Sequence, residues 1–231
     1  MRIALFGAHG GTGRLLTRQA LDAGYTVVAV TRRPAEFPIA HPRLAVAHAD
    51  VRDRASVASA IAGADAVLST LGTPFTRKPI TLYSEGIAGI AAGMERHGVK
   101  RVVVVGSAAT DPRPHADGGF LLNKVIQPLV TATIGKTTYA DMRQMEAYLR
   151  ASALDWTVIR PAGLFDADEV SAYRLDEDHA DGVFTSRADL AASMLAQLET
   201  TQWVHRNVAV TTSAGAPTVL QMIRREAFSS R

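Results

Sequence analysis

Residues 7–13 read GAHGGTG, which places four glycines in seven positions between the apolar run MRIALF and the amphipathic run RLLTRQALDAGY. Glycine loses more backbone freedom on folding than any other residue, so four of them together need a structural reason. The segment has the form GxxGxxG, and it lies between a predicted strand and a predicted helix. A strand, a glycine-rich turn and a helix in this order are typical of a dinucleotide-binding unit.

The rest of the chain alternates apolar runs with helical patterns, which predicts βαβ units around a parallel sheet. The predicted strands are 2–6, 26–31, 44–50, 64–70, 101–106, 155–161 and 206–211. The predicted helices are 12–23, 53–63, 81–97, 139–151, 187–198 and 217–228. We therefore expect a single Rossmann-type, doubly wound α/β domain over residues 1–231, with a parallel sheet in the order 3-2-1-4-5-6 and the cofactor across the carboxyl ends of the strands.

Two less regular stretches are expected to form a small substrate-side region. Residues 108–137 make a long connection, which is often a lid or a binding loop. Residues 162–231 supply the carboxyl-terminal part of this region. We expect the substrate to lie over Ser107, under the first stretch and near Phe165.

Composition excludes several other classes of protein. The 231 residues are 47% hydrophobic and include no cysteine, which fits a globular core in the cytoplasm and gives no disulfide or thiol nucleophile. No apolar run approaches the roughly 20 residues of a membrane span. The net charge is +3 without a long basic stripe, so we expect no nucleic-acid partner. The seven histidines show no metal-binding spacing, so no metal is expected.

Each glycine of the loop has a separate expected role. Gly7 suits the tight turn, Gly10 lets the backbone approach a pyrophosphate, and Gly13 lets the helix pack close to the sheet. The free N–H groups near Gly11 and Thr12 would face the anion.

The end of the second strand indicates which dinucleotide binds. A carboxylate there would favour NAD, but Thr31, Arg32 and Arg33 occupy this point. A guanidinium pairs well with a 2′-phosphate, so NADP(H) is expected in preference to NAD(H). The alternative is that both arginines are solvated surface charges. Asp50 and Val51 end the third strand, where Asp50 either accepts from the adenine amine or caps the next helix.

Several stretches resemble the atypical short-chain dehydrogenase/reductases, a group that includes NAD(P)H-binding proteins of the NmrA-like and flavin-reductase-like types. GAHGGTG resembles the GATGxTG fingerprint of that group. Further similar stretches are HADVRD (48–53), HGVKRVVVVGSAA (97–109), LRASALDWTVIRPAGL (149–164) and SRADLAASML (186–195). The resemblance covers most of the chain and implies the fold and the cofactor, whereas the reaction varies among reductases, epimerases and cofactor sensors.

The resemblance also implies cofactor contacts at matching positions. They are Gly7, His9, Gly10, Gly11 and Thr12 for the phosphates, Arg32 for the 2′-phosphate, Asp50 and Val51 for adenine, Thr70, Leu71 and Gly72 along the ribose, and Pro161 and Ala162 beside the nicotinamide. His9 stands where the family usually has threonine, and its imidazole can still donate to a phosphate.

The family's catalytic set is a serine, a tyrosine and a lysine four residues after the tyrosine, whose ammonium lowers the tyrosine pKa. Here Ser107 ends the fifth strand and Tyr139 begins a helix, but Arg143 replaces the lysine. The planar guanidinium does not reproduce a point ammonium. The alternative is that Tyr139 and Arg143 are surface neighbours one helical turn apart.

These observations predict an oxidoreductase that transfers a hydride from NADPH to a small acceptor, either a flavin, a quinone or a carbonyl. A flavin or a quinone can take its proton from water, so it does not require the missing lysine. The alternatives are a non-catalytic NADP(H)-binding redox sensor and a sugar-nucleotide epimerase, which the missing lysine disfavours. The expected partners are the nucleotide and a small-molecule substrate, and a homodimer is left open.

Overall fold

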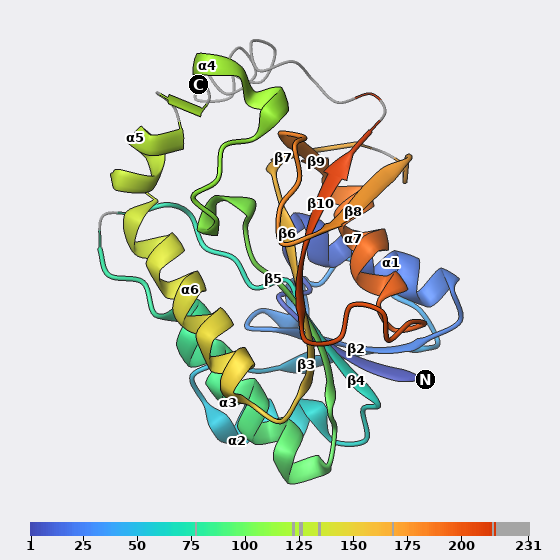
Figure 1. Cartoon of the computed structure of the whole chain (residues 1–231). Coiled ribbons are helices and arrows are strands. Elements are labelled where there is room, and N and C mark those ends of the chain that lie inside the picture. Colours follow the sequence, from blue (N-terminus) through green and yellow to red (C-terminus); the bar gives the residue numbers. More distant parts are fainter. Residues whose placement is uncertain are drawn as a thin grey trace.

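The computed structural model describes residues 1–76, 78–121, 123–124, 127–133, 135–167, 169–213 and 215. Within them an eight-stranded sheet lies between two layers of helices (Figure 1). Its strands are β1 (Arg2–Phe6), β2 (Thr26–Thr31), β3 (Leu44–His48), β4 (Ala66–Ser69), β5 (Arg101–Val105), β6 (Asp155–Pro161), β8 (Tyr173–Glu177) and β10 (Arg206–Thr212).

The strand order is β3-β2-β1-β4-β5-β6-β10-β8. The predicted order 3-2-1-4-5-6 and the Rossmann-type α/β class are therefore confirmed. The expectation of a wholly parallel sheet fails only at one edge, where β8 pairs antiparallel with β10. The inner parallel strands are apolar because both of their faces are covered, and Val102, Val103 and Val104 of β5 are all buried.

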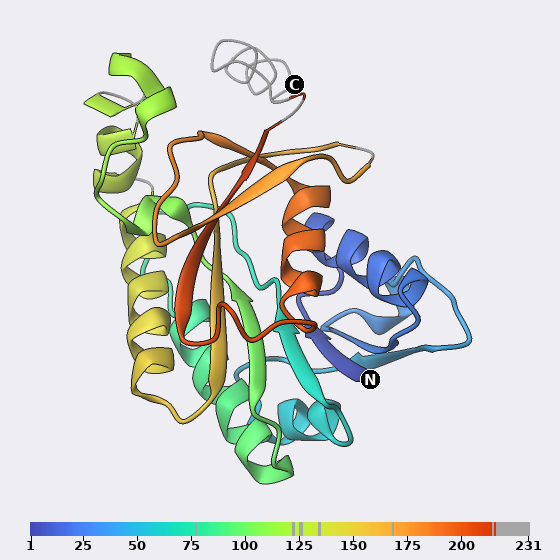
Figure 2. The same cartoon turned by 45° about the vertical axis from the view of Figure 1, so that its right-hand side comes forward.

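Helices of the two layers bury separate cores on opposite faces of the sheet. Helices α1 (Gly11–Asp22) and α7 (Arg187–Ala196) lie together on one face, as Figure 2 shows. Helices α2 (Arg54–Ile61), α3 (Leu82–His97) and α6 (Lys136–Ala151) cover the other face. The helix predicted over 139–151 begins three residues earlier than expected, and the helix predicted over 217–228 lies outside the described residues.

The region predicted to bind the substrate comprises the segments that follow β5 and β6. After β5 come two 3₁₀ turns and the short helices α4 (Gly119–Leu121) and α5 (Gln127–Ala132). After β6, strands β7 (Gly163–Phe165) and β9 (Phe184–Ser186) pair in a small parallel sheet. Both groups of elements lie at the same end of the molecule in Figure 1.

Candidate functional site

The glycine loop makes a tight turn whose two ends are fixed by close backbone contacts. Gly7 has a φ of 75°, and a methyl group added there would lie 2.7 Å from the Thr70 carbonyl carbon. A methyl group at Gly13 would lie 2.3 Å from the Gly7 carbonyl oxygen. These two positions therefore need glycine for the turn and for the close packing of α1.

Gly10 differs from the other two glycines because no protein atom crowds it. An added methyl group would meet only the Gly7 carbonyl oxygen, at 3.4 Å, and the φ of −67° is open to any residue. No side chain caps α1 here, and its first turn contains no acidic residue. The first N–H groups of a helix have no intrahelical acceptor. The start of α1 thus has the backbone donors and the free space that a diphosphate requires.

His9 adds a polar atom without a partner beside this turn. Its Nδ1 is buried and has no hydrogen-bond partner among the described residues. The ring packs edge-on against Phe37, with 6.1 Å between the centroids. A bound phosphate would satisfy such an atom, so the residues present fit a dinucleotide.

The two arginines after β2 differ in their surroundings. Both are exposed, and Arg33 forms an ion pair with Glu36 at 2.8 Å. Arg32 forms no ion pair within the part of the chain that the structure describes. Arg32 is therefore the better placed of the two for a 2′-phosphate.

Asp50 does not cap the helix that follows it. Its Oδ1 accepts from the Arg52 backbone N–H at 3.0 Å, while Asp53 caps α2 by accepting from the Ala55 N–H. Of the two alternatives for Asp50, helix capping is wrong. Val51 is buried between α2 and α3, where it packs in the core.

The end of β4 is tied to the glycine loop. The Thr70 hydroxyl lies 3.2 Å from the Phe6 carbonyl oxygen and 3.1 Å from that of Gly7. Leu71 is partly buried, and an added methyl group at Gly72 would have nothing within 4 Å. The predicted ribose positions therefore border the same edge of the sheet as the glycine loop.

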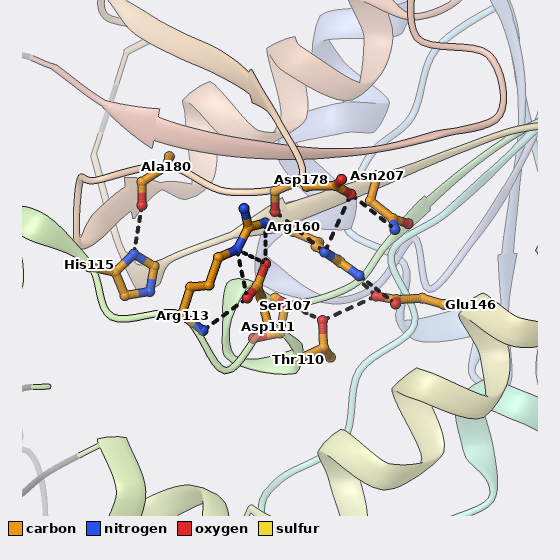
Figure 3. Close-up of polar contacts among 10 residues, drawn as sticks. All are labelled: Ser107, Thr110, Asp111, Arg113, His115, Glu146, Arg160, Asp178, Ala180 and Asn207. Carbon is orange, nitrogen blue, oxygen red and sulfur yellow. Dashed lines mark hydrogen bonds and ion pairs between the residues drawn. The ribbon is translucent and has the colours of Figure 1, made fainter. Parts of the chain in front are cut away.

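Ser107 lies two residues after the end of β5 and caps a 3₁₀ turn. Its Oγ accepts from the Ala109 N–H at 3.2 Å. The Thr110 hydroxyl lies 2.8 Å from the Ser107 carbonyl oxygen and 3.2 Å from Oε1 of Glu146 (Figure 3). Ser107 is thus held through Thr110 by a carboxylate of helix α6.

That carboxylate belongs to a buried ion pair. Glu146 and Arg160 have only 2% and 8% of their side chains exposed, and they form two hydrogen bonds, at 3.0 and 2.6 Å. Arg160 also lies 3.4 Å from the Asp178 carbonyl oxygen. Figure 3 shows how this cluster joins α6, the end of β6 and the segment before β9. It fixes Ser107 relative to Pro161.

A second set of contacts joins the segments on either side of the site. The hydrogen bond to Arg113 holds the pKa of Asp111 below its usual value. Nδ1 of His115 lies 2.7 Å from the Ala180 carbonyl oxygen, and the rings of His115 and His179 stack 5.1 Å apart. The segment after β5 is therefore attached to the segment before β9 (Figure 3).

Tyr139 lies beside Ser107, whereas Arg143 does not join them. Burial raises the pKa of the Tyr139 hydroxyl, the nearby Tyr83 adds to this rise, and a hydrogen bond with Ser107 opposes it. The Tyr139 ring also packs edge-to-face on the half-exposed Phe75, at 5.8 Å. Arg143 lies on the exposed face of α6 and is not among the groups that shift this pKa.

The predicted nicotinamide positions are fixed by strands from later in the chain. Pro161 ends β6, and the Ala162 N–H donates to the Thr185 hydroxyl at 3.0 Å. The buried Thr185 hydroxyl in turn donates to the Val210 carbonyl oxygen at 2.6 Å.

Sequence reasoning missed Glu146 and Arg160, although one signal was available. Glu146 stands on the buried face of α6, beside Met142, Met145 and Leu149. A charged residue on an apolar face is almost never buried unless it is paired, so it predicts a buried partner. Nothing in the sequence identifies that partner.

In the described part of the chain no three His, Asp or Glu side chains gather as a metal site.

Residues 7–201 match the NAD(P)H-binding family. The chain belongs to this family. Among the described residues, no helix is both long and apolar enough to cross a bilayer.

Three known proteins are similar to parts or to most of this chain. An uncharacterized protein of Mycobacterium tuberculosis is 36% identical over 108 residues, which are 46% of this chain but only 12% of that longer protein. The Bacillus subtilis protein YhfK, named an uncharacterized sugar epimerase, is 26% identical over 206 residues, covering 86% of this chain and 88% of YhfK. The structure of a short-chain dehydrogenase/reductase from Veillonella parvula in complex with NADP has a TM-score of 0.77 at 18% identity, and the match covers 92% and 95% of the two chains. The last likeness shows a shared fold.

Proposed function

We propose that this protein is an NADPH-dependent oxidoreductase of the atypical short-chain dehydrogenase/reductase type, acting in the cytoplasm on a small planar acceptor such as a flavin or a quinone. The observation that carries the choice of acceptor is the surroundings of Tyr139. Its pKa is raised by burial, and the cation four residues on is exposed to solvent. A phenol whose pKa is raised releases its proton less readily, so it is a poor general acid for a carbonyl that is being reduced to an alcohol.

The cofactor would be held by residues at the ends of five strands, β1, β2, β3, β4 and β6. The N–H groups at the start of α1 and the imidazole of His9 would bind the phosphates, and Arg32 would pair with the 2′-phosphate. Asp50 would accept from adenine. Thr70, Leu71 and Gly72 would border the ribose, and Pro161 with Ala162 would lie beside the nicotinamide. When bound, NADPH supplies the hydride.

The chain's own groups would then bind and orient the acceptor. The Ser107 hydroxyl and the protonated Tyr139 hydroxyl would form hydrogen bonds with a ring oxygen or nitrogen of the acceptor. Phe75 would offer a half-exposed aromatic face for stacking. Such a site acts through orientation, and the acceptor takes its proton from water.

Two alternative functions, a redox sensor and a sugar epimerase, would behave differently from an oxidoreductase. A redox sensor would bind NADP(H) without turnover and would bind a protein partner according to the state of the cofactor. Sugar epimerization, which the name of YhfK attributes to that relative, needs proton transfer at a sugar carbon or oxygen. Arg143 in place of the lysine disfavours it.

Steady-state oxidation of NADPH, with NADH as the comparison, tests the proposal against FMN, a quinone and a simple aldehyde. Turnover of FMN or the quinone should survive Tyr139→Phe within a few-fold. The matched control is Tyr148→Phe, which alters an exposed tyrosine on the same helix. Aldehyde turnover that Tyr139→Phe abolishes would instead restore acid–base catalysis by Tyr139. NADPH binding without any turnover would favour the sensor.

A further inference from the structure

Arg187, the first residue of α7, lies directly over the start of α1. A methyl group added at Gly11 would be 3.3 Å from Cδ of Arg187 and 3.5 Å from its Nε. Gly11 is the first residue of α1 and directly follows Gly10, where space for a diphosphate is open. The two helices pack side by side on one face of the sheet (Figure 2). A side chain from the carboxyl-terminal part of the chain therefore reaches the candidate phosphate site.

This guanidinium lies in unusually positive surroundings. Arg187 begins one helix and packs on the beginning of another, and each helix N-terminus carries roughly half a positive charge. The first turn of α1 has no acidic residue. The acid in the first turn of α7, Asp189, is buried and already accepts hydrogen bonds from Ser171 and Thr212.

The only ion pair that Arg187 forms within the described residues is with Asp166. The Nε to Oδ1 distance is 2.8 Å, but the Asp166 side chain is 89% exposed. Exposed pairs of this kind contribute little, because water screens them. Among the described residues, the exposed carboxylate of Asp166 is therefore the one negative charge that pairs with Arg187 beside the positive ends of α1 and α7. An anion that binds beside Arg187 at the start of α1 would be favoured.

We propose that Arg187 binds the pyrophosphate of NADP(H), and that Asp166 holds its guanidinium when no nucleotide is bound. This inference rests on the proposed function, because it concerns the same cofactor. An arginine fork forms charge-assisted hydrogen bonds with phosphate oxygens that an exposed carboxylate cannot outweigh. Asp166 lies just after β7 on the substrate side. Binding of the nucleotide thus changes the partner of a substrate-side residue.

The proposal separates Arg187 from Arg32. The pyrophosphate is common to NADPH and NADH, whereas the 2′-phosphate belongs to NADPH alone. Loss of Arg187 should therefore weaken the binding of both nucleotides equally, and loss of Arg32 should weaken the binding of NADPH alone.

Isothermal titration of the full chain with NADPH and with NADH tests the inference. Arg187→Gln should lower the affinity for each nucleotide by roughly tenfold, which is the size expected for the loss of a hydrogen bond to a charged group. Arg187→Lys keeps the charge and should recover part of this loss. Asp166→Asn removes the competing carboxylate and should leave both affinities unchanged or raise them. The control is Arg174→Gln, which removes an exposed guanidinium from its pair with Asp176 on β8 and should change neither affinity.

The outcomes distinguish the two proposals. Wild-type affinity in Arg187→Gln would overturn the role of Arg187 and leave the proposed function intact. Equal weakening by Arg187→Gln and Asp166→Asn would also overturn it, because the pair would then act only by shaping the loop. Failure of the wild-type chain to bind either nucleotide would instead overturn the proposed cofactor. Melting temperatures of the nucleotide-free variants verify that each is folded.

Discussion

The two halves of the candidate site are built in different ways. The glycine loop is made by seven consecutive residues, and its shape depends on side chains that are absent. The Ser107 half is made by buried polar side chains from α6 and β6, together with a backbone carbonyl from the segment after β8. A binding surface for a charged nucleotide can be formed by exposed backbone N–H groups. A single position for one serine instead requires partners that converge from distant parts of the chain.

The largest expected effect comes from breaking the buried pair on the Ser107 side. Glu146→Ala leaves the Arg160 guanidinium buried without its carboxylate, which typically costs about 3–5 kcal/mol. Urea unfolding should show this loss in the free energy of unfolding. Asp176→Asn breaks the pair with Arg174, whose guanidinium is exposed to water, and should cost less than about 1 kcal/mol. If both substitutions cost the same, the buried cluster does not fix this half of the site.

The next test compares two glycines of the same loop. Gly13→Ala forces a methyl group to within 2.3 Å of the Gly7 carbonyl oxygen, so it should lower both the melting temperature and the affinity for NADPH. Gly10→Ala meets only an ordinary contact inside the protein. It should leave the melting temperature nearly unchanged. The affinity for NADPH should fall by roughly tenfold or more, because the methyl group projects toward the pyrophosphate. A Gly10→Ala variant that binds as tightly as the wild type would remove Gly10 from the site.

A smaller effect is expected at the end of β2. Arg32→Gln should lower the affinity for NADPH by roughly tenfold and leave the affinity for NADH unchanged, because only NADPH carries the 2′-phosphate. Arg33→Gln is the matched control, since Glu36 already pairs with Arg33. Fluorescence titration gives the affinity of each of the two variants for NADPH and for NADH. Loss of preference in the Arg33 variant alone would exchange the roles of the two arginines.

The smallest effect concerns the pH dependence of stability. The Tyr139 pKa is raised by burial above the ordinary value of 10.0, so the folded chain holds its proton at a pH where the unfolded chain releases it. Its contribution is fully present below pH 10 and is lost as the pH rises through the folded-state pKa, with a slope of at most about 1.4 kcal/mol per pH unit. Tyr139→Phe should flatten the fall in unfolding free energy above pH 10. An unchanged fall would mean that Tyr139 titrates as it does in the unfolded chain.

The contrast between the halves also explains what the sequence could predict. The order of the first six strands follows from the alternation of apolar runs and helices, and the glycine loop follows from local spacing. The Glu146–Arg160 pair could not be foreseen, because the sequence does not say which faces of α6 and β6 meet. For the same reason Asp141 of α6, which accepts from the backbone N–H groups of Tyr83 and Ser84, was not predicted to cap α3.

The edge of the sheet gives a second example. The run at Arg206–Thr212 was predicted as a strand, and it lies beside β6. Strand β8 was not predicted, because YRLDE is only partly buried and has mixed polarity. An edge strand is stabilised by its pairing with β10, so its own apolar pattern is weak. Arg187 likewise lies in a stretch that resembles the family, and only the packing of α7 on α1 shows that it reaches the glycine loop.

The most direct test of the central claim is isothermal titration of the wild-type chain with NADPH and with NADH. NADPH should bind at one saturable site, and NADH should bind there roughly tenfold more weakly, as expected for the loss of one charge-assisted phosphate contact. No binding of either nucleotide would contradict the assignment of GAHGGTG as a dinucleotide site. Equal or tighter binding of NADH would contradict the role of Arg32 and leave the glycine loop assignment standing.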